Sequence, residues 1–363
     1  GTANKRITFM SCKDQNFGAN TSTIPQCAGV VPTSNRYGTA IWIQSTSGMT
    51  TNDTFSYLNM YDANVGIRID KNILSINDNN FTGFKCLDTT ATTCNGIKVT
   101  QASAVKIYDN NFVNFSLAMP IILASTYSGE IYKNYFTGLN SYSGIYAAGV
   151  VFAGSVHDNN FNNFVNTAGY AVYHATANFP GSIYNNTVSS SVSSNKPAFN
   201  VNNFTGSIYN NTFKNNSTMY GVLITGTSSG SIYNNTFKNN STMHGVIITG
   251  TSSGSIYNNN FSQGKLASIG LLFNGISTTK VYNNTFSDIS STGYAIENIS
   301  TFNGTITRNL FTNINGTAIK TISVGAVAGY NAYYNVNIIG VTSNQTVGDQ
   351  NIATGFTTDP FIA

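Results

Sequence analysis

The sequence has few charged residues and few of the residues that build helices. Only 8% of its 363 residues are charged, and it contains 2 Glu, 11 Leu and a single Trp. Helical proteins draw heavily on Leu and Glu, so this scarcity excludes a mainly helical fold. Disordered chains are poor in apolar residues. Here 41% of the residues are hydrophobic, with 21 Tyr and 23 Phe, so disorder is excluded as well.

Long apolar runs and clusters of positive charge are also missing. No run of about 18 apolar residues is present, so we expect no transmembrane helix. The net charge is only +4, and Lys and Arg are spread along the chain. We therefore expect neither nucleic acid nor an anionic membrane as a partner. The sequence shows no start Met and no signal peptide, which is typical of a processed or trimmed chain.

The four cysteines form two local pairs, Cys12 with Cys27 and Cys86 with Cys94. Neither pair has the spacing of a metal or redox motif. We predict two local disulfides, and hence an extracellular or cell-surface location, because disulfides persist in oxidising compartments. Four buried thiols are the alternative.

Asn and Thr are abundant, with 53 and 45 copies, and much of this abundance lies in an internal repeat. Residues 206–229 and 230–253 differ only at Tyr220/His244 and Leu223/Ile247. The shared pattern, apolar-x-x-Asn-x-aromatic, recurs along the chain at intervals of 24 to 31 residues. Its asparagines are Asn79, Asn110, Asn134, Asn159, Asn186, Asn211, Asn235, Asn259, Asn284 and Asn309. Weaker copies place Asn59 before this series and Asn331 after it.

A period of about 24 residues with alternating apolar and polar positions indicates a solenoid of β-strands. We predict an all-β fold, a single parallel β-helix of about 12–14 coils with three short strands per coil. Identical positions then stack, which forms Ile and Phe columns in the core. The asparagines form a ladder of amides and supply the left-handed backbone of a tight turn. The predicted organisation is N-terminal coils with a Cys-containing insertion (1–55), regular coils (56–334) and a closing segment (335–363).

The apolar-x-x-Asn-x-Phe coils resemble the right-handed parallel β-helix superfamily, often called pectate-lyase-like. The opening, Gly1–Ser11, is similar to a coil common in its secreted members, although Arg6 stands where that coil usually has Pro. The ending, Asp359-Pro360-Phe361-Ile362, resembles the closing segment of many members. The resemblance implies a right-handed β-helix. It leaves function open, because the superfamily contains lyases, hydrolases, epimerases, tailspikes, adhesins and scaffolds.

The resemblance also implies that a lyase would bind Ca²⁺ through acidic residues and use a Lys or Arg base. A column one residue before the asparagines offers Asp78, Asp109, Lys133 and Asp158 on four coils. This column is either a cation or sugar site or, as we favour, a solvated ladder of ion pairs. No zinc, phosphate-loop or Ser-His-Asp pattern is present. We assign no catalytic residue and expect no cofactor, with Ca²⁺ arising only under the lyase alternative.

Most of the remaining candidate residues are expected on the outside of the coils. His157 and His244 stand where other coils carry Tyr, and His174 has no evident partner. A row of tyrosines is expected to point outward, either as a self-stacking ladder or as a face that binds sugars or another molecule. Its members are Tyr108, Tyr132, Tyr184, Tyr209, Tyr233, Tyr257 and Tyr282. Among 18 N-glycosylation sequons, four occupy one repeated turn position: Asn185, Asn210, Asn234 and Asn283.

Two hypotheses on function follow. The first is an extracellular, glycosylated structural β-solenoid that forms a filament or surface layer by head-to-tail self-association. Uniform repeats, sparse titratable groups and the lack of a capping helix before Ile7 favour it, because open coil ends invite stacking. The second is a secreted carbohydrate-active enzyme of the polysaccharide lyase type, or a carbohydrate-binding adhesin or viral fibre. The sequence favours a protein that is not an enzyme.

Overall fold

The computed structural model describes residues 7–9, 39–44, 52–61, 63–85, 94–140, 143–147, 149–164, 169–190, 196–215, 220–239, 244–263, 268–321, 327–338 and 350–351. All regular elements within these ranges are β-strands. The chain divides into two compact units, Gly1–Tyr173 and His174–Ala363. Both are parallel β-solenoids, so the predicted all-β fold is confirmed.

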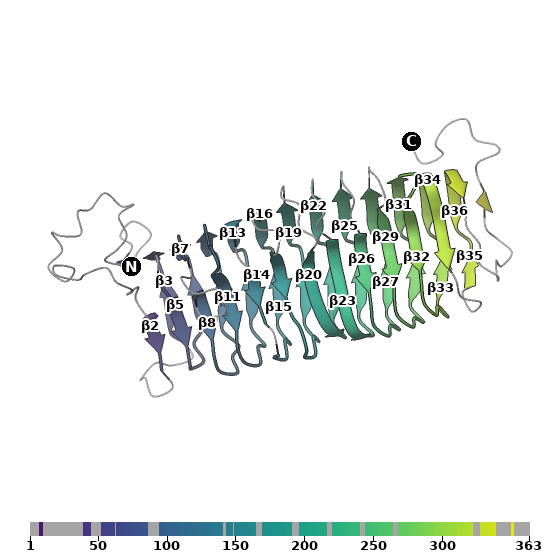
Figure 1. Cartoon of the computed structure of the whole chain (residues 1–363). Helices are drawn as coiled ribbons and strands as arrows, with labels where there is room; N and C mark the ends of the chain where they lie inside the picture. Colours follow the sequence, from purple (N-terminus) through teal and green to yellow (C-terminus); the bar gives the residue numbers. More distant parts are fainter. Residues whose placement is uncertain are drawn as a thin grey trace. The chain divides into compact units, whose positions relative to one another are not determined.

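In unit 1, each coil contributes a first, a second and a third strand, and each strand pairs in parallel with its counterpart one coil away (Figure 1). The first strands are β2 (Thr39–Ile43), β5 (Val65–Ile69), β8 (Asn95–Val99), β11 (Met119–Leu123), β14 (Ser143–Tyr146) and β17 (Tyr170–Tyr173). The second strands are β3 (Thr54–Ser56), β6 (Ser75–Asn77), β9 (Lys106–Tyr108), β12 (Glu130–Tyr132) and β15 (Ser155–His157). The third strands are β1 (Ile7–Phe9), β4 (Leu58–Tyr61), β7 (Asn80–Thr82), β10 (Asn111–Val113), β13 (Tyr135–Leu139) and β16 (Asn160–Phe164).

Unit 2 repeats this arrangement. Its first strands are β20 (Pro197–Phe204), β23 (Tyr220–Ser228), β26 (His244–Ile248), β29 (Ile269–Phe273) and β32 (Tyr294–Asn298). Its second strands are β18 (Ser182–Tyr184), β21 (Ser207–Tyr209), β24 (Ser231–Tyr233), β27 (Ser255–Tyr257), β30 (Lys280–Tyr282), β33 (Thr305–Thr307) and β35 (Val327–Gly329). Its third strands are β19 (Thr187–Ser190), β22 (Thr212–Asn215), β25 (Thr236–Asn239), β28 (Asn260–Gln263), β31 (Thr285–Ile289), β34 (Leu310–Thr321), β36 (Ala332–Ile338) and β37 (Gln350–Asn351). The long β34 also pairs with the first strand β32 through its second half.

The core of each unit consists of columns of identical residues, as predicted. In unit 1 the rings of Phe81, Phe112, Phe136 and Phe161 stack with centroids 4.6 to 5.0 Å apart. In unit 2 the same column runs from Phe213 to Phe311, with centroids 4.7 to 5.2 Å apart. These spacings match the distance between neighbouring strands of a sheet, because each ring sits directly above the next. Face-to-face stacking therefore follows from the in-register coils.

A turn joins the second strand of each coil to the third, and the ladder asparagine lies on it. The structure corrects one detail of the prediction here. The left-handed residue is the one before the ladder asparagine: Asp78, Asp109, Lys133 and Asp158 in unit 1 have φ of 52° to 57°. None of the ten predicted ladder asparagines has a positive φ. The candidate column thus coincides with the strained position of the turn.

The first copy of the ladder is also displaced by one residue. At this coil Leu58, not Asn59, occupies the ladder position, because the Leu58 N–H donates to Asn79 Oδ1 at 2.9 Å. Asn59 instead accepts a hydrogen bond from Asn80 Nδ2 on the outer side of the third strands. The last copy is placed correctly, since Asn331 Oδ1 accepts from the Asn309 N–H at 2.9 Å.

Candidate functional site

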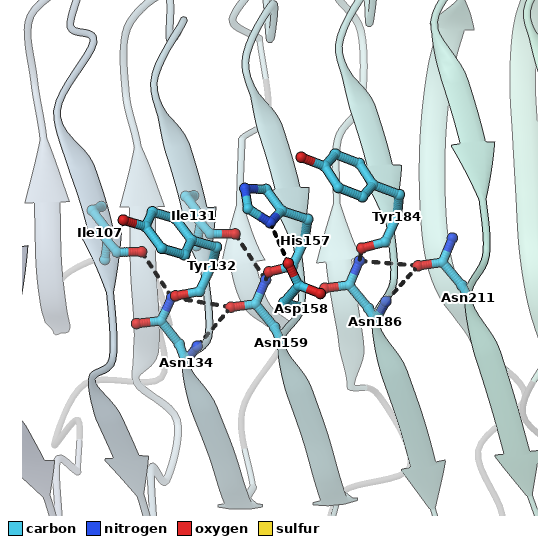
Figure 2. Close-up of polar contacts among 10 residues, drawn as sticks. All are labelled: Ile107, Ile131, Tyr132, Asn134, His157, Asp158, Asn159, Tyr184, Asn186 and Asn211. Carbon is cyan, nitrogen blue, oxygen red and sulfur yellow. Dashed lines mark hydrogen bonds and ion pairs between the residues drawn. The ribbon is translucent and has the colours of Figure 1, made fainter.

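The turn between the second and third strands combines a buried amide ladder with an exposed row of turn residues. Figure 2 shows one step of the ladder from each unit, Asn134–Asn159 and Asn186–Asn211. The backbone N–H of Asn134 and its Nδ2 both donate to Asn159 Oδ1, at 2.9 and 3.0 Å. Asn186 makes the same two bonds to Asn211 Oδ1, both at 3.0 Å. The ladder side chains are almost fully buried, so their polar atoms serve the fold.

Each ladder amide also holds the strand before it. Asn134 Nδ2 lies 2.8 Å from the carbonyl oxygen of Ile107, one coil away, and 3.0 Å from that of Tyr132 in its own coil. Asn235 makes the matching contacts to Ile208 and Tyr233 in unit 2, at 2.9 and 3.0 Å. Backbone groups that the turn would leave unpaired are satisfied in this way. This accounts for an asparagine directly after the left-handed residue in the ten turns from Asn79 to Asn309.

The candidate column forms a charged row on the surface of unit 1. Asp109, Lys133 and Asp158 are exposed, and Asp78 is partly exposed. Partial burial raises the pKa of Asp109, and the charge of Asp78 adds to this, while Lys133 lowers it. His157 Nδ1 lies 2.7 Å from Asp158 Oδ2. The structure therefore places the four residues at the same turn position of their coils, where both Asp78 and Lys133 lie close enough to Asp109 to shift its pKa.

A second charged pair lies beside this row. Lys106 Nζ lies 2.9 Å from Glu130 Oε2, across the second strands of adjacent coils. The hydrogen bond to Glu130 and its negative charge raise the pKa of Lys106. In the part of the chain that the structure describes, no group of three or more His, Cys, Asp or Glu side chains could hold a metal ion.

The outward tyrosines stack on one another within each unit. In unit 1, Tyr108 stacks on Tyr132 and Tyr132 on His157, with centroids 4.8 and 4.9 Å apart. In unit 2 the row from Tyr184 to Tyr282 continues at 4.8 to 5.0 Å. Because the ring faces lie against neighbouring rings, the row presents ring edges and hydroxyl groups. This geometry supports the self-stacking ladder over a face for stacking sugar rings.

The other two histidines lie on the first-strand side of unit 2. His174 is fully buried, and its ring contacts Phe179 edge-on with a centroid distance of 5.1 Å. His244 lies at the start of β26 next to Tyr220, at 5.0 Å. Burial lowers the pKa of His244, and the negative charge of Glu297 partly offsets this.

The structure describes one of the four cysteines in the predicted disulfides. Cys12, Cys27 and Cys86 lie outside the described residues, and Cys94 is buried just before β8. Both pairings stay predictions.

The structure adds a cluster that the sequence patterns did not reveal. Trp42, with an exposed fraction of 51%, donates through Nε1 to Asp70 Oδ2 at 2.7 Å. Arg68 Nε donates to Asp70 Oδ1 at 2.9 Å, and its Cζ lies 4.7 Å from the Trp42 ring centroid. Thr100 Oγ1 also donates to Asp70. Burial raises the pKa of Asp70, but the bonds from Arg68, Thr100 and Trp42 outweigh it and hold the pKa below its ordinary value.

This cluster begins an outward row along the first strands of unit 1. In register, Trp42 pairs with Arg68, Arg68 with Lys98, Lys98 with Ile122, and Ile122 with Tyr146. Arg68 and Lys98 thus lie between Trp42 and the buried Ile122. Nothing periodic marks the start of the row in the sequence, because Trp42, Arg68, Lys98 and Ile122 are four different residue types.

Comparison with known proteins agrees with the fold. A family model described as a right handed beta helix region matches residues 181–355, where the ladder and the Phe column of unit 2 lie. Both units have the fold of a parallel β-helix. Neither the curated proteins nor the solved structures gave a match to this β-helix. No helix within the described ranges is long and apolar enough to cross a membrane.

Proposed function

We propose that this β-helix protein is an extracellular structural solenoid whose copies stack head to tail into a filament or surface layer. The observation that carries the proposal is the pairing of two nearly identical coils, residues 206–229 and 230–253. In it Thr212 lies on Thr236, Phe213 on Phe237 and Lys214 on Lys238. One face of a coil is therefore complementary to the opposite face of a near-copy. The same complementarity would join the last coil of one molecule to the first coil of the next.

The strand β1 offers a place to test this. The Ile7 N–H donates to the Tyr57 carbonyl oxygen at 3.3 Å, on the side of β4. Consecutive residues of a parallel strand direct their N–H groups to opposite sides, so the Thr8 N–H points away from β4. An incoming coil would bond to this side of the strand.

Negative-stain electron microscopy of the protein at neutral pH tests the proposal. We expect filaments from the unmodified protein and dispersed particles from Thr8→Pro, which removes the outward donor and leaves the Ile7 bond. Thr8→Ala is the matched control and should still form filaments. Dispersed particles from the unmodified protein at high concentration would overturn the proposal.

A second candidate function, a carbohydrate-binding surface, is favoured by the row that starts at Trp42. An exposed indole is suited to stack on a sugar ring, and Arg68 and Lys98 beside it are suited to bind carboxylate or sulfate groups. Binding of acidic polysaccharides, with and without Ca²⁺, is the test. Trp42→Ala should abolish binding, while Leu74→Ala, which removes another exposed apolar side chain of unit 1, should not. Equal binding by both variants would remove this candidate.

A further inference from the structure

The exposed turn of unit 2 holds five asparagines in one conformation. Asn185, Asn210, Asn234, Asn258 and Asn283 precede the ladder asparagines and have φ of 55° or 56°. All five are exposed, whereas the ladder asparagine that follows each of them is buried. In each of these turns the ladder asparagine is therefore buried within the fold, and the asparagine before it is exposed to solvent.

Four of these five asparagines are followed two residues later by threonine. The threonines are Thr187, Thr212, Thr236 and Thr285, each at the start of a third strand and partly exposed. The fifth, Asn258, is followed by Asn260 and so lacks the acceptor motif. In unit 1 the same turn position holds Asp78, Asp109, Lys133 and Asp158, none of which can accept an N-glycan. No ladder asparagine has the motif either, because an inward apolar or aromatic residue stands two residues after it.

We propose that Asn185, Asn210, Asn234 and Asn283 carry N-linked oligosaccharides, which form a row along the turn edge of unit 2. The inference rests on the proposed extracellular role and adds the site and chemistry of a modification. The donor would be a sugar activated on a diphosphate and transferred by a cellular glycosyltransferase. The Nδ2–C1 bond forms as the bond from C1 to the diphosphate oxygen breaks, and the proton lost from Nδ2 leaves with the diphosphate.

The stacking of the coils sets the distance between neighbouring glycans in this row. The tyrosines next to the acceptors, Tyr209 and Tyr233, have ring centroids 4.9 Å apart, so Asn210 and Asn234 are one strand spacing apart. Asn283 is separated from Asn234 by the turn of Asn258, which lacks the motif. Glycans on consecutive turns therefore crowd one another, and we expect lower occupancy at Asn210 and Asn234 than at Asn283.

Mass spectrometry of peptides from the protein purified from its own cells tests the inference. We expect glycan at Asn185, Asn210, Asn234 and Asn283 and none at Asn258. Unmodified asparagine at all four sites, or glycan only at other sequons, would overturn it. Microscopy of the same sample distinguishes the two proposals. Glycans without filaments would overturn only the filament proposal, and filaments without glycans would overturn only the glycosylation proposal.

Two sets of variants expressed in the native host sharpen the assignment. Thr212→Val and Thr236→Val keep a β-branched residue in the strand and should abolish modification at Asn210 and Asn234, whereas the matched Thr→Ser changes should preserve it. Asn260→Thr completes the motif at Asn258 and should create a fifth site. Unchanged glycan after both valine substitutions, or an unmodified Asn258 in Asn260→Thr, would contradict the role of the turn.

Discussion

The two units build the same turn from different residues. At the left-handed position unit 1 carries Asp78, Asp109, Lys133 and Asp158, with the Lys106–Glu130 pair beside them. At the same position unit 2 carries five asparagines in succession and then Arg308. The ladder beneath is identical, with Asn Nδ2 to Oδ1 distances close to 3.0 Å in both. The turn therefore fixes the backbone and the buried amide and leaves the exposed residue free to differ.

This difference teaches what the position requires. Asn and Asp tolerate a positive φ better than other residues with a side chain, because their short polar groups bond locally. Tyr57, Lys133, Arg308 and Tyr330 are departures from this preference. The position therefore carries mostly charged residues in unit 1 and mostly neutral amides in unit 2.

The largest predicted effect lies in the core, where the two units should behave alike. Phe136→Ala in unit 1 and Phe237→Ala in unit 2 each remove one ring from a column and should destabilise the fold by about 3–5 kcal/mol. Phe237→Leu is the control and should cost under about 1.5 kcal/mol. Denaturant unfolding followed by circular dichroism measures both. An effect confined to one unit would show that only that unit depends on its column.

The next effect concerns the ladder. Asn134→Ala and Asn235→Ala remove the acceptor of the backbone N–H of the preceding ladder residue. They also remove the amide that donates to the carbonyl oxygens of Ile107 and Ile208. We expect a loss of about 2–3 kcal/mol in each unit, since each buried unsatisfied group costs about 1–3 kcal/mol. Asn258→Asp, at the exposed turn position, is the control and should be nearly neutral. Equal losses in the control and the ladder variants would contradict a special role for the buried amide.

A reciprocal exchange at the turn tests the comparison itself. Lys133→Asn should stabilise unit 1 by up to about 1 kcal/mol, because it relieves a left-handed lysine, and Asn234→Lys should destabilise unit 2 by about the same amount. Differential scanning calorimetry of unglycosylated protein gives the two shifts in Tm. Shifts of the same sign would mean that the charges around Lys133 outweigh its backbone strain.

The smallest effect is a pH dependence at His244. Because burial lowers its pKa in the folded state, the unfolded chain binds the proton more tightly. Stability is then full above about pH 6.5, the unfolded value, and falls as the pH drops below it. His244→Tyr introduces the residue that the nearly identical coil carries at this position, Tyr220, and should remove this loss of stability. Thermal unfolding at pH 7 and pH 5 compares the two proteins, and parallel changes would assign the loss to other groups.

The fold could be predicted because its information is periodic. Ile, Asn and Phe recur in fixed order, and in-register coils turn each recurrence into a column. The one-residue error in the left-handed position arose because both residues of Asn-Asn pairs, such as Asn210 and Asn211, suit a turn. Only the backbone separates them.

The outer surface was harder to predict, for two physical reasons. Strand alternation predicted the outward direction of Tyr209 and Tyr233 but not the packing of their ring faces, which depends on side-chain rotamers. The Trp42, Arg68 and Asp70 cluster joins residues from two coils, 28 positions apart for Trp42 and Asp70, and the neighbouring coil has Lys98 and Thr100 at the positions of Arg68 and Asp70. By contrast, Lys106 and Glu130 are 24 residues apart, so the period could have shown this pair.

The two nearly identical coils also indicate how the length of such a gene can change. Residues 206–229 and 230–253 differ at two positions, and each begins and ends at the same point of the coil. Loss or duplication of one such segment by recombination would keep every column in register, whereas a partial segment would shift them. The coding sequence can therefore lengthen or shorten in whole coils, and length variation among alleles should come in steps of 24 codons.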